Sequence, residues 1–256
     1  MKNNNKNAQK MDKIMGIKVI SRTTSEVLTR VKDFISHNKK FYIVTPNPEI
    51  ILASMNNEKL KKALNEADLS VPDGVGLKVA DPSLKIIKGR ELFLDLVKLA
   101  EKNKWRIFLL GGLGNEAEVA AMKLKIKIPK LLIERDCGPK LNEVGIPLTE
   151  KEAGLEKNVI DRINKLKPEL LFVAFGNPRQ EIWVYEHLKK LNIGGAMCVG
   201  GTFRYIAGKS TLPPKWFPDS FEWLWRVITE PKRVWRIFRS VVVFPVKILS
   251  SKLSGK

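Results

Sequence analysis

Two short polar motifs in this chain combine residue types that can bind an anion or remove a proton. The first is TPNPE at 45–49, where Asn47 is placed to cap a helix, and the second is PDGVG at 72–76, where Asp73 directly follows an apolar run. A helix N-terminus is a ready anion site. A carboxylate within hydrogen-bond reach of a hydroxyl can act as a general base. Each residue also has a simpler interpretation, because Asn and Asp are common helix caps.

Three further motifs follow apolar runs in the same way: GGLG at 111–114, GNPRQE at 176–181 and GGTF at 200–203. Glycines allow a backbone to approach a phosphate or a ribose closely. The first motif is neither a complete GxGxxG nor a P-loop with its lysine, so it is a weak dinucleotide signal and excludes a P-loop NTPase. The polar side chains of the second suit a base, a sugar or a phosphate, or simply form the solvated first turn of a helix.

Other chemistries have little support in the sequence. His37 and His187 fall on helical patterns away from these motifs and are expected at the surface. The chain has no Cys and His cluster with metal-ligand spacing and no Asp-x-Asp pair, and it lacks a Gly-x-Ser-x-Gly elbow. We therefore predict neither a metal nor another cofactor. Cys137 and Cys198 are expected to be buried, reduced thiols.

The elements that position these motifs alternate along the chain. Short apolar runs, typical of strands covered on both faces, occur at 41–44, 69–71, 107–110, 131–133, 170–175 and 196–199. Helical spacing of apolar residues fills the segments between them at 58–67, 92–103, 116–125, 151–166 and 181–191. This alternation predicts a Rossmann-like α/β fold, with a mainly parallel sheet and helices on both faces. Ligands of such sheets bind where strands end, which is where the motifs lie.

Composition divides the chain into three parts. Residues 1–14 are predicted to be a disordered leader, residues 15–212 the α/β domain, and residues 213–256 a basic, Trp-rich helical appendage. The leader has no apolar h-region, and no run of eighteen apolar residues exists that would span a bilayer. The net charge of +19 predicts a polyanionic partner: nucleic acid, anionic lipid or a phosphorylated ligand.

The appendage suits an anionic membrane surface. Four of the six tryptophans lie in it, together with nine Lys or Arg and three Asp or Glu from residue 215 onward. Interleaved cations and tryptophans are typical of interfacial helices. Nucleic acid is the competing polyanion, but no nucleic-acid fold motif is present, so we expect no such partner. On a helix, Arg226, Arg233 and Arg236 would share one face, which would meet water or phosphate.

Six motifs, in order, resemble those of the bacterial WecG/TagA/CpsF glycosyltransferase family. They are TPN at 45–47, PDGVG at 72–76, FLLGG at 108–112, FGNPRQE at 175–181, VGGTF at 199–203, and EWL at 222–224 followed by EPKR at 230–233. The resemblance implies an inverting, metal-independent transferase of cell-surface polysaccharide or teichoic acid synthesis. Its donor would be a UDP-linked N-acetylhexosamine, often N-acetylmannosamine or its uronic acid. Its acceptor would be a polyprenyl-diphosphate-linked sugar at the cytoplasmic membrane face, where the protein would be peripheral.

The resemblance also assigns roles to residues. Asp73 would be the catalytic base, and Thr45 and Asn47 would line the catalytic centre. The residues expected to bind substrate are Gly111, Gly112, Asn177, Gln180, Gly201, Thr202, Arg226, Arg233 and Arg236, of which the three arginines would meet the acceptor diphosphate.

Two positions depart from the family pattern. Arg204 stands where the family usually carries Asp, and Ile86 stands where it usually carries Arg. These departures motivate an alternative, a catalytically degenerate paralogue that binds a nucleotide sugar or lipid. A nucleic-acid-binding α/β protein is a further alternative that rests on charge alone. The apolar appendage also allows self-association into a homo-oligomer.

Overall fold

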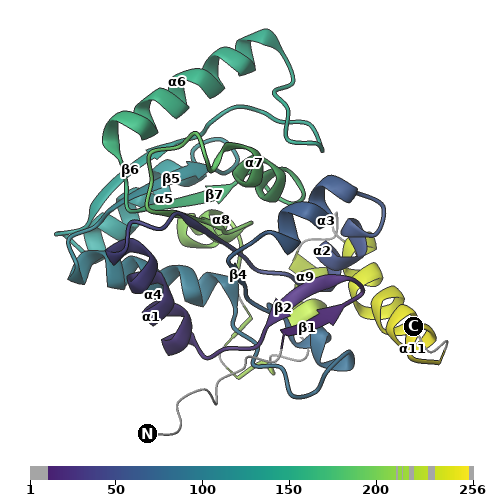
Figure 1. Ribbon diagram of the computed structural model, residues 1–256. Coiled ribbons are helices and arrows are strands. Elements are labelled where there is room, and N and C mark those ends of the chain that lie inside the picture. Colours follow the sequence, from purple (N-terminus) through teal and green to yellow (C-terminus); the bar gives the residue numbers. More distant parts are fainter. Residues whose placement is uncertain (1–10, 212, 215, 219–221, 230–233, 254–256) are drawn as a thin grey trace, which may run out of the picture.

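The computed structural model describes residues 11–211, 213–214, 216–218, 222–229 and 234–253 (Figure 1). Its centre is a six-stranded parallel sheet of order β4-β3-β8-β7-β5-β6. The strands are β3 (Phe41–Val44), β4 (Leu69–Ser70), β5 (Arg106–Gly111), β6 (Leu132–Asp136), β7 (Leu170–Ala174) and β8 (Gly195–Cys198). The predicted Rossmann-like α/β fold and its six sheet strands are therefore confirmed.

Helices cover both faces of this sheet. They are α1 (Thr24–Ser36), α2 (Pro48–Ser54), α3 (Glu58–Asn65), the 3-10 helix η1 (Val75–Val79), α4 (Gly89–Lys102), α5 (Glu116–Lys127), α6 (Glu150–Leu166), α7 (Arg179–His187) and α8 (Thr202–Ala207). One buried cluster joins the sheet to α2, α3, α6 and α7, and a second joins it to α1, α4, α5 and α8. Figure 1 shows α6 and α7 on one side of the sheet and α1 and α4 on the other.

Strand β7 shows why an unbroken apolar run predicts burial on two faces. Leu171 and Val173 enter one cluster, whereas Leu170 and Phe172 enter the other, because successive side chains of a strand point to opposite faces. The same expectation is wrong for β6. That strand ends the sheet order, and its Leu132 and Glu134 are exposed.

An antiparallel hairpin of β1 (Met11–Ile14) and β2 (Ile17–Ile20) precedes the sheet. The expected disordered leader, 1–14, is therefore too long by the strand β1. The turn places Met15 at φ 49° and Gly16 at φ 80°, the conformation that two-residue hairpins favour. Ile17 and Val19 bury their side chains in the core, which ties the hairpin to the domain.

The appendage contains α9 (Glu222–Thr229), α10 (Val234–Phe238), the π-helical segment η4 (Arg239–Val243) and α11 (Phe244–Leu253). Phe244 and Ile248 of α11 are buried in the cluster that also holds α2. Lys252 Nζ donates to the carbonyl of Val79, at the end of η1, at 3.3 Å. The last helix is thus docked on the α/β domain. Within the described ranges, no helix is both long and apolar enough to cross a membrane.

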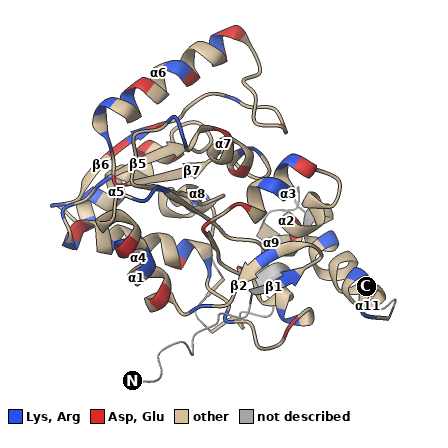
Figure 2. Cartoon of the chain, in the orientation of Figure 1, with Lys and Arg blue, Asp and Glu red and all other residues tan. Residues whose placement is uncertain are grey.

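The basic residues are spread widely. Figure 2 shows Lys and Arg on helices of both layers, with Asp and Glu among them on α3 and α6. Much of the net charge of +19 therefore lies on solvated helix surfaces. Charge alone does not single out one binding face.

Candidate active site

The parallel strands bring five of the sequence motifs to one edge of the sheet. After β3 and β7 the chain enters α2 and α7 on one face, and after β5 and β8 it enters α5 and α8 on the other. These four strands are neighbours in the order β3-β8-β7-β5. Loops that separate to opposite faces at a carboxyl edge form the usual ligand site of α/β sheets. The predicted gathering of the motifs is therefore found.

Thr45 and Asp73 converge on the first residue of α4. A Cβ added to Gly89 would lie 3.3 Å from Thr45 Oγ1 and 3.4 Å from Asp73 Oδ2. The backbone holds this arrangement, because Asp73 N donates to the Pro46 carbonyl at 2.8 Å. Both side chains are only partly buried. A hydroxyl and a carboxylate therefore both lie at the positive end of a 14-residue helix, where anions are attracted.

Asp73 does not occupy the cap position of the helix that follows it. Gly74 is the N-cap of η1 and makes no side-chain cap bond. The capping interpretation of Asp73 therefore fails at that position, and a carboxylate at the strand end is what a general base requires.

Asn47, by contrast, is a helix cap. Its Oδ1 accepts from Ile50 N at 3.0 Å, with Pro48 as the first residue of α2. Among the described residues, no partner is found for its amide nitrogen, and the side chain is partly exposed. The cap thus fixes the side chain in one orientation and leaves its Nδ2 as a donor.

A buried polar network supports the motif at the end of β7. Gln180 Nε2 donates to Glu181 Oε1 at 2.7 Å, and Asn177 Nδ2 donates to Glu181 Oε2 at 3.2 Å. Gln180 Oε1 accepts from Gly200 N at 3.1 Å, which joins this motif to the loop after β8. Gln180 and Glu181 are 3% and 1% exposed. Gln180 therefore lies behind the surface of the site.

Glu181 is a functional candidate that the sequence analysis missed. Its burial raises the pKa of its carboxyl group, and the nearby Glu49 raises it further, while the hydrogen bonds from Gln180 and Asn177 act in the opposite direction. The available signal was its place in the motif that also holds Asn177 and Gln180, both of them expected to bind substrate. Nothing in the local sequence shows that its carboxylate turns inward.

The glycines after β5 are explained by packing within the chain. Gly111 has φ 100°, and a Cβ there would lie 2.9 Å from the carbonyl carbon of Ala174. Gly112 N donates to the Ala174 carbonyl at 3.0 Å. Gly111 is buried, whereas Gly112 is partly exposed. Of this pair, only Gly112 presents backbone at the surface of the site.

The motif after β8 likewise contains one buried and one exposed residue of those expected to bind substrate. Thr202 is 4% exposed, and its hydroxyl donates to the Val199 carbonyl at 2.6 Å. Gly201 is exposed. Arg204, the departure from the family pattern, follows in α8, and its Nε is buried without a hydrogen-bond partner among the described residues.

The expected arginine face of the appendage is described only in part. Arg233 lies outside the described residues. Arg226 and Arg236 belong to α9 and α10, for which only the backbone is described at these two positions. Ile86, the other departure, packs against the core cluster that includes α2 and α7.

Several smaller expectations are also decided. Cys198 is buried, and burial raises the pKa of its thiol, but Cys137 is exposed because it follows the edge strand β6. His37 is exposed, as expected. His187 is partly buried instead, because its ring stacks on Trp183 at 4.5 Å. In the described ranges, no group of three or more His, Cys, Asp or Glu could hold a metal ion.

An open pocket of about 350 Å³ lies near the carboxyl ends of β5 and β6, away from Thr45 and Asp73. Its cations already have partners. Arg162 pairs with Asp136, and Arg135 pairs with Glu118 at 2.8 Å. This pocket, which includes Gly114 of the motif at 111–114, therefore supports anion binding less strongly than the site of Thr45 and Asp73 at the start of α4 does.

Comparison with known proteins decides the family. The Glycosyl transferase WecG/TagA/CpsF family matches residues 12–256 of the chain. This chain belongs to that family. The match spans both the α/β domain and the appendage. The chain is therefore a glycosyltransferase.

Individual relatives agree with this assignment. Proteins of Staphylococcus aureus strains NCTC 8325 / PS 47, COL and MRSA252 are each 29% identical over 254 residues, covering 96% of this chain and 94% of the relative. Each of these relatives is named N-acetylglucosaminyldiphosphoundecaprenol N-acetyl-beta-D-mannosaminyltransferase. The WecG/TagA/CpsF membership thus favours the enzyme over the nucleic-acid-binding alternative.

Proposed function

We propose that this WecG/TagA/CpsF glycosyltransferase transfers N-acetylmannosamine, or its uronic acid, from UDP to an N-acetylglucosamine linked to a polyprenyl diphosphate. The names of the Staphylococcus aureus relatives support the transferred sugar and the lipid-linked acceptor. The observation that carries the chemistry is the convergence of Thr45 and Asp73 on Gly89 at the carboxyl edge of the sheet.

In the proposed reaction, Asp73 accepts the proton of the acceptor hydroxyl. The hydroxyl oxygen attacks the anomeric carbon from the face opposite UDP, and the bond from that carbon to the diphosphate oxygen breaks. UDP leaves with the electron pair, and the configuration at the anomeric carbon inverts. No residue becomes covalently modified, so one correctly placed carboxylate is sufficient.

Neighbouring residues hold the substrates for this step. Thr45 Oγ1 lies beside the carboxylate and orients the reacting hydroxyl, and the capped Asn47 offers its amide nitrogen. Gly112 and Gly201 allow the donor to approach the backbone. Buried Gln180, Glu181 and Thr202 position these loops from behind.

Phosphate-bearing parts of the substrates need cations. Arg226, Arg233 and Arg236 of the appendage are proposed to meet the acceptor diphosphate, because a guanidinium fork matches phosphate oxygens. The docking of α11 beside α2 and η1 supports this role, because those two segments follow Asn47 and Asp73 directly. The appendage is proposed to hold the enzyme on the inner face of the cell membrane.

The test measures UDP release from UDP-N-acetylmannosamine with a polyprenyl-diphosphate-linked N-acetylglucosamine analogue as acceptor. Asp73→Asn should lower the turnover at least about 100-fold, since general base catalysis contributes 10²–10⁴. Asp161→Asn, which changes an exposed carboxylate on α6, is the matched control and should keep full activity. Both variants should unfold at the wild-type temperature.

If the Asp73→Asn variant keeps its turnover, Asp73 is not the general base of this reaction. Tight binding of the UDP sugar by the wild-type protein without any transfer would instead support the degenerate paralogue suggested by Arg204 and Ile86.

A further inference from the structure

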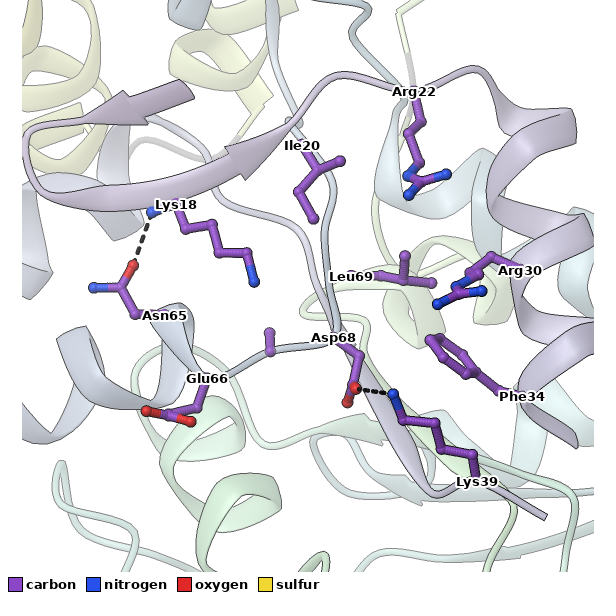
Figure 3. A pocket seen from close by; sticks show the side chains of 11 residues that line it. Lys18, Ile20, Arg22, Arg30, Phe34, Lys39, Asn65, Glu66, Asp68 and Leu69 are labelled. Carbon is purple, nitrogen blue, oxygen red and sulfur yellow. Dashed lines mark hydrogen bonds and ion pairs between the residues drawn. The ribbon is translucent and has the colours of Figure 1, made fainter. Parts of the chain in front are cut away.

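A second cationic pocket lies on the opposite edge of the sheet from the candidate active site. It has a volume of about 350 Å³, which falls within the usual range for small-molecule sites. Its lining includes Lys18 and Ile20 of β2, Arg22 of the link between β2 and α1, Arg30 and Phe34 of α1, and Leu69 of β4 (Figure 3). Asp68 and Lys39 precede β4 and β3, so the pocket is at the amino ends of these strands.

Three cations in this pocket form no ion pair with any described carboxylate, although Arg22 exerts a small electrostatic attraction on Glu26. In the described part of the chain, no carboxylate forms an ion pair with Lys18, Arg22 or Arg30, and Arg22 Nε is buried without a hydrogen-bond partner. The fourth cation, Lys39, pairs with Asp68 at 3.8 Å. A buried guanidinium atom without a partner carries a desolvation cost that an anionic ligand would offset.

The acidic side chains near these cations already form hydrogen bonds or an ion pair with other groups. Glu26 accepts from Thr23 N and from Thr23 Oγ1, at 2.6 and 2.8 Å, as the capping box of α1. Asp68 accepts from Tyr42 N at 3.2 Å in addition to its pair with Lys39. Glu66 lies across the pocket from the two arginines in Figure 3. The arginine side of the pocket thus remains positive.

The surroundings hold the cationic groups in place before any ligand arrives. The Arg30 guanidinium lies 4.6 Å from the centre of the Phe34 ring, a cation–π contact that fixes its plane. Asn65 Oδ1 accepts from Lys18 N at 2.8 Å, and Asn65 Nδ2 donates to the Gly16 carbonyl at 3.0 Å. The hairpin wall and the helix wall are therefore both fixed. Figure 3 shows the Lys18 amine and the two guanidinium groups on opposite sides of Ile20 and Leu69.

We propose that this pocket binds a phosphate monoester or a diphosphate group. On one side of the pocket the guanidinium groups of Arg22 and Arg30 can each present donors to phosphate oxygens, and Lys18 adds a third positive charge from the other side of the apolar residues. The apolar strip of Ile20 and Leu69 supports the uncharged part of the ligand next to the phosphate. The proposal does not depend on the transferase assignment, because the pocket shares no residue with the strand-end motifs.

Titration calorimetry with inorganic pyrophosphate tests the proposal on the full chain, with saturating UDP present to occupy the donor site. The wild-type protein should bind one pyrophosphate under these conditions. Arg22→Gln/Arg30→Gln should raise the Kd at least about tenfold, because charge-assisted hydrogen bonds are lost. Lys18→Gln is an independent variant that should weaken binding in the same direction.

The control removes the same charge outside the pocket. Lys32→Gln/Lys102→Gln changes two exposed lysines of α1 and α4 that do not line it, and its Kd should stay within about twofold of the wild-type value. Equal weakening by both double variants, or pyrophosphate binding that UDP abolishes completely, would overturn the proposal.

A vesicle experiment identifies the source of the phosphate. Sedimentation with phosphatidylglycerol vesicles should fall in Arg22→Gln/Arg30→Gln, relative to the lysine control, if the ligand is a lipid headgroup. Unchanged sedimentation together with weakened pyrophosphate binding identifies a soluble phosphorylated ligand. Either source supports the site.

Discussion

Gly89 is the residue where the start of α4 comes nearest to the side chains of Thr45 and Asp73. The space that a side chain would fill there is bounded by the hydroxyl of Thr45 and the carboxylate of Asp73. A glycine at the start of α4 therefore lets the helix approach two side chains from different strand ends. None of the sequence motifs contains Gly89, and its distance from residues 45–47 along the chain gives no sign of this contact.

Gly89→Ala should reduce transfer with little effect on stability. The new methyl group forces Thr45 Oγ1 and Asp73 Oδ2 apart by a few tenths of an ångström, and misplaced reacting groups cost about tenfold or more in rate. Steady-state kinetics and thermal unfolding measure the two effects separately. Gly154→Ala in α6 is the control, because a Cβ there meets nothing within 4 Å; it should stabilise by about 0.5–1 kcal/mol and leave the rate unchanged.

Glu181 predicts a pH dependence of stability. Burial raises the pKa of its carboxyl group in the folded protein above the ordinary value of 4.5. As the pH rises past that value, the unfolded chain releases this proton first, so the contribution of Glu181 to the free energy of unfolding falls. That contribution is complete below pH 4.5 and is lost as the pH rises through the folded pKa.

Urea unfolding of Glu181→Gln over a pH series measures this effect. The stability advantage of the wild type over the variant should be largest at acid pH and shrink as the pH rises. Glu143→Gln, at an exposed loop position, should track the wild type at every pH. A constant difference between wild type and Glu181→Gln would show that the carboxyl has an ordinary pKa.

At the scale of elements, the sheet was predictable because buried parallel strands are apolar on both faces. The strands β3, β5, β7 and β8 meet that condition, and the edge strand β6 does not. Its exposure depends on strand order and on what covers the edge, because the other edge strand, β4, is buried beside the hairpin, where Ser70 Oγ donates to the Lys18 carbonyl; the local pattern encodes neither. The predicted helices omit α1, although its Val27, Val31 and Phe34 recur at the spacing of a buried helix face. The hairpin of β1 and β2 is missed because β1 is short and carries charge.

The gathering of the site motifs could likewise be predicted, since parallel strands end on one edge. Which residues of each motif turn inward and which stay at the surface could not be predicted. Gln180 and Thr202 turn inward while Gly201 is exposed, and this depends on which neighbouring loop supplies a hydrogen-bond partner. Gln180 accepts from Gly200 N, about twenty residues away in the chain, and Thr202 donates to the Val199 carbonyl within the loop after β8.

The helix α11 belongs to the core as well as to the appendage. Phe244 and Ile248 are one turn apart and both buried, whereas Val246 is 60% exposed. Phe244→Ala should therefore destabilise the protein by about 3–5 kcal/mol through the cavity that it leaves. Val246→Ala on the same helix should change stability by less than about 0.5 kcal/mol. Chemical unfolding of both variants measures the difference, and equal small effects would mean that α11 is not docked in solution.

At the scale of the whole molecule, the helix α11 of the appendage has two apolar surfaces. One surface faces the α/β domain, and the other carries Val246, Leu249 and Leu253, all of them exposed. In the sequence, Lys247, Ser250 and Ser251 share one face of this helix and flank the apolar residues, but they do not show which apolar face is docked, so the sequence predicts a membrane-directed helix but not the docked face. The proposed membrane contact belongs to the exposed surface.

Vesicle sedimentation tests that contact. Replacing Val246, Leu249 and Leu253 with Ser should weaken binding to anionic vesicles, because buried apolar area drives interfacial insertion. Replacing Met122, Ile126 and Leu132 with Ser removes three exposed apolar side chains from α5 and β6 and should leave binding unchanged. Binding that survives the first triple change would place the membrane contact elsewhere. The remaining electrostatic part should decrease with salt.

The burial of Phe244 and Ile248 has a consequence for the order of events during synthesis. The cluster that receives them also contains Ile17 and Val19 of the hairpin, made more than two hundred residues earlier. That layer of the core cannot be completed before residue 248 has left the ribosome, although domains otherwise begin to fold from the amino end. The newborn chain therefore completes its interior at nearly the same time as it exposes Leu249 and Leu253, the last residues of the surface proposed to meet the bilayer.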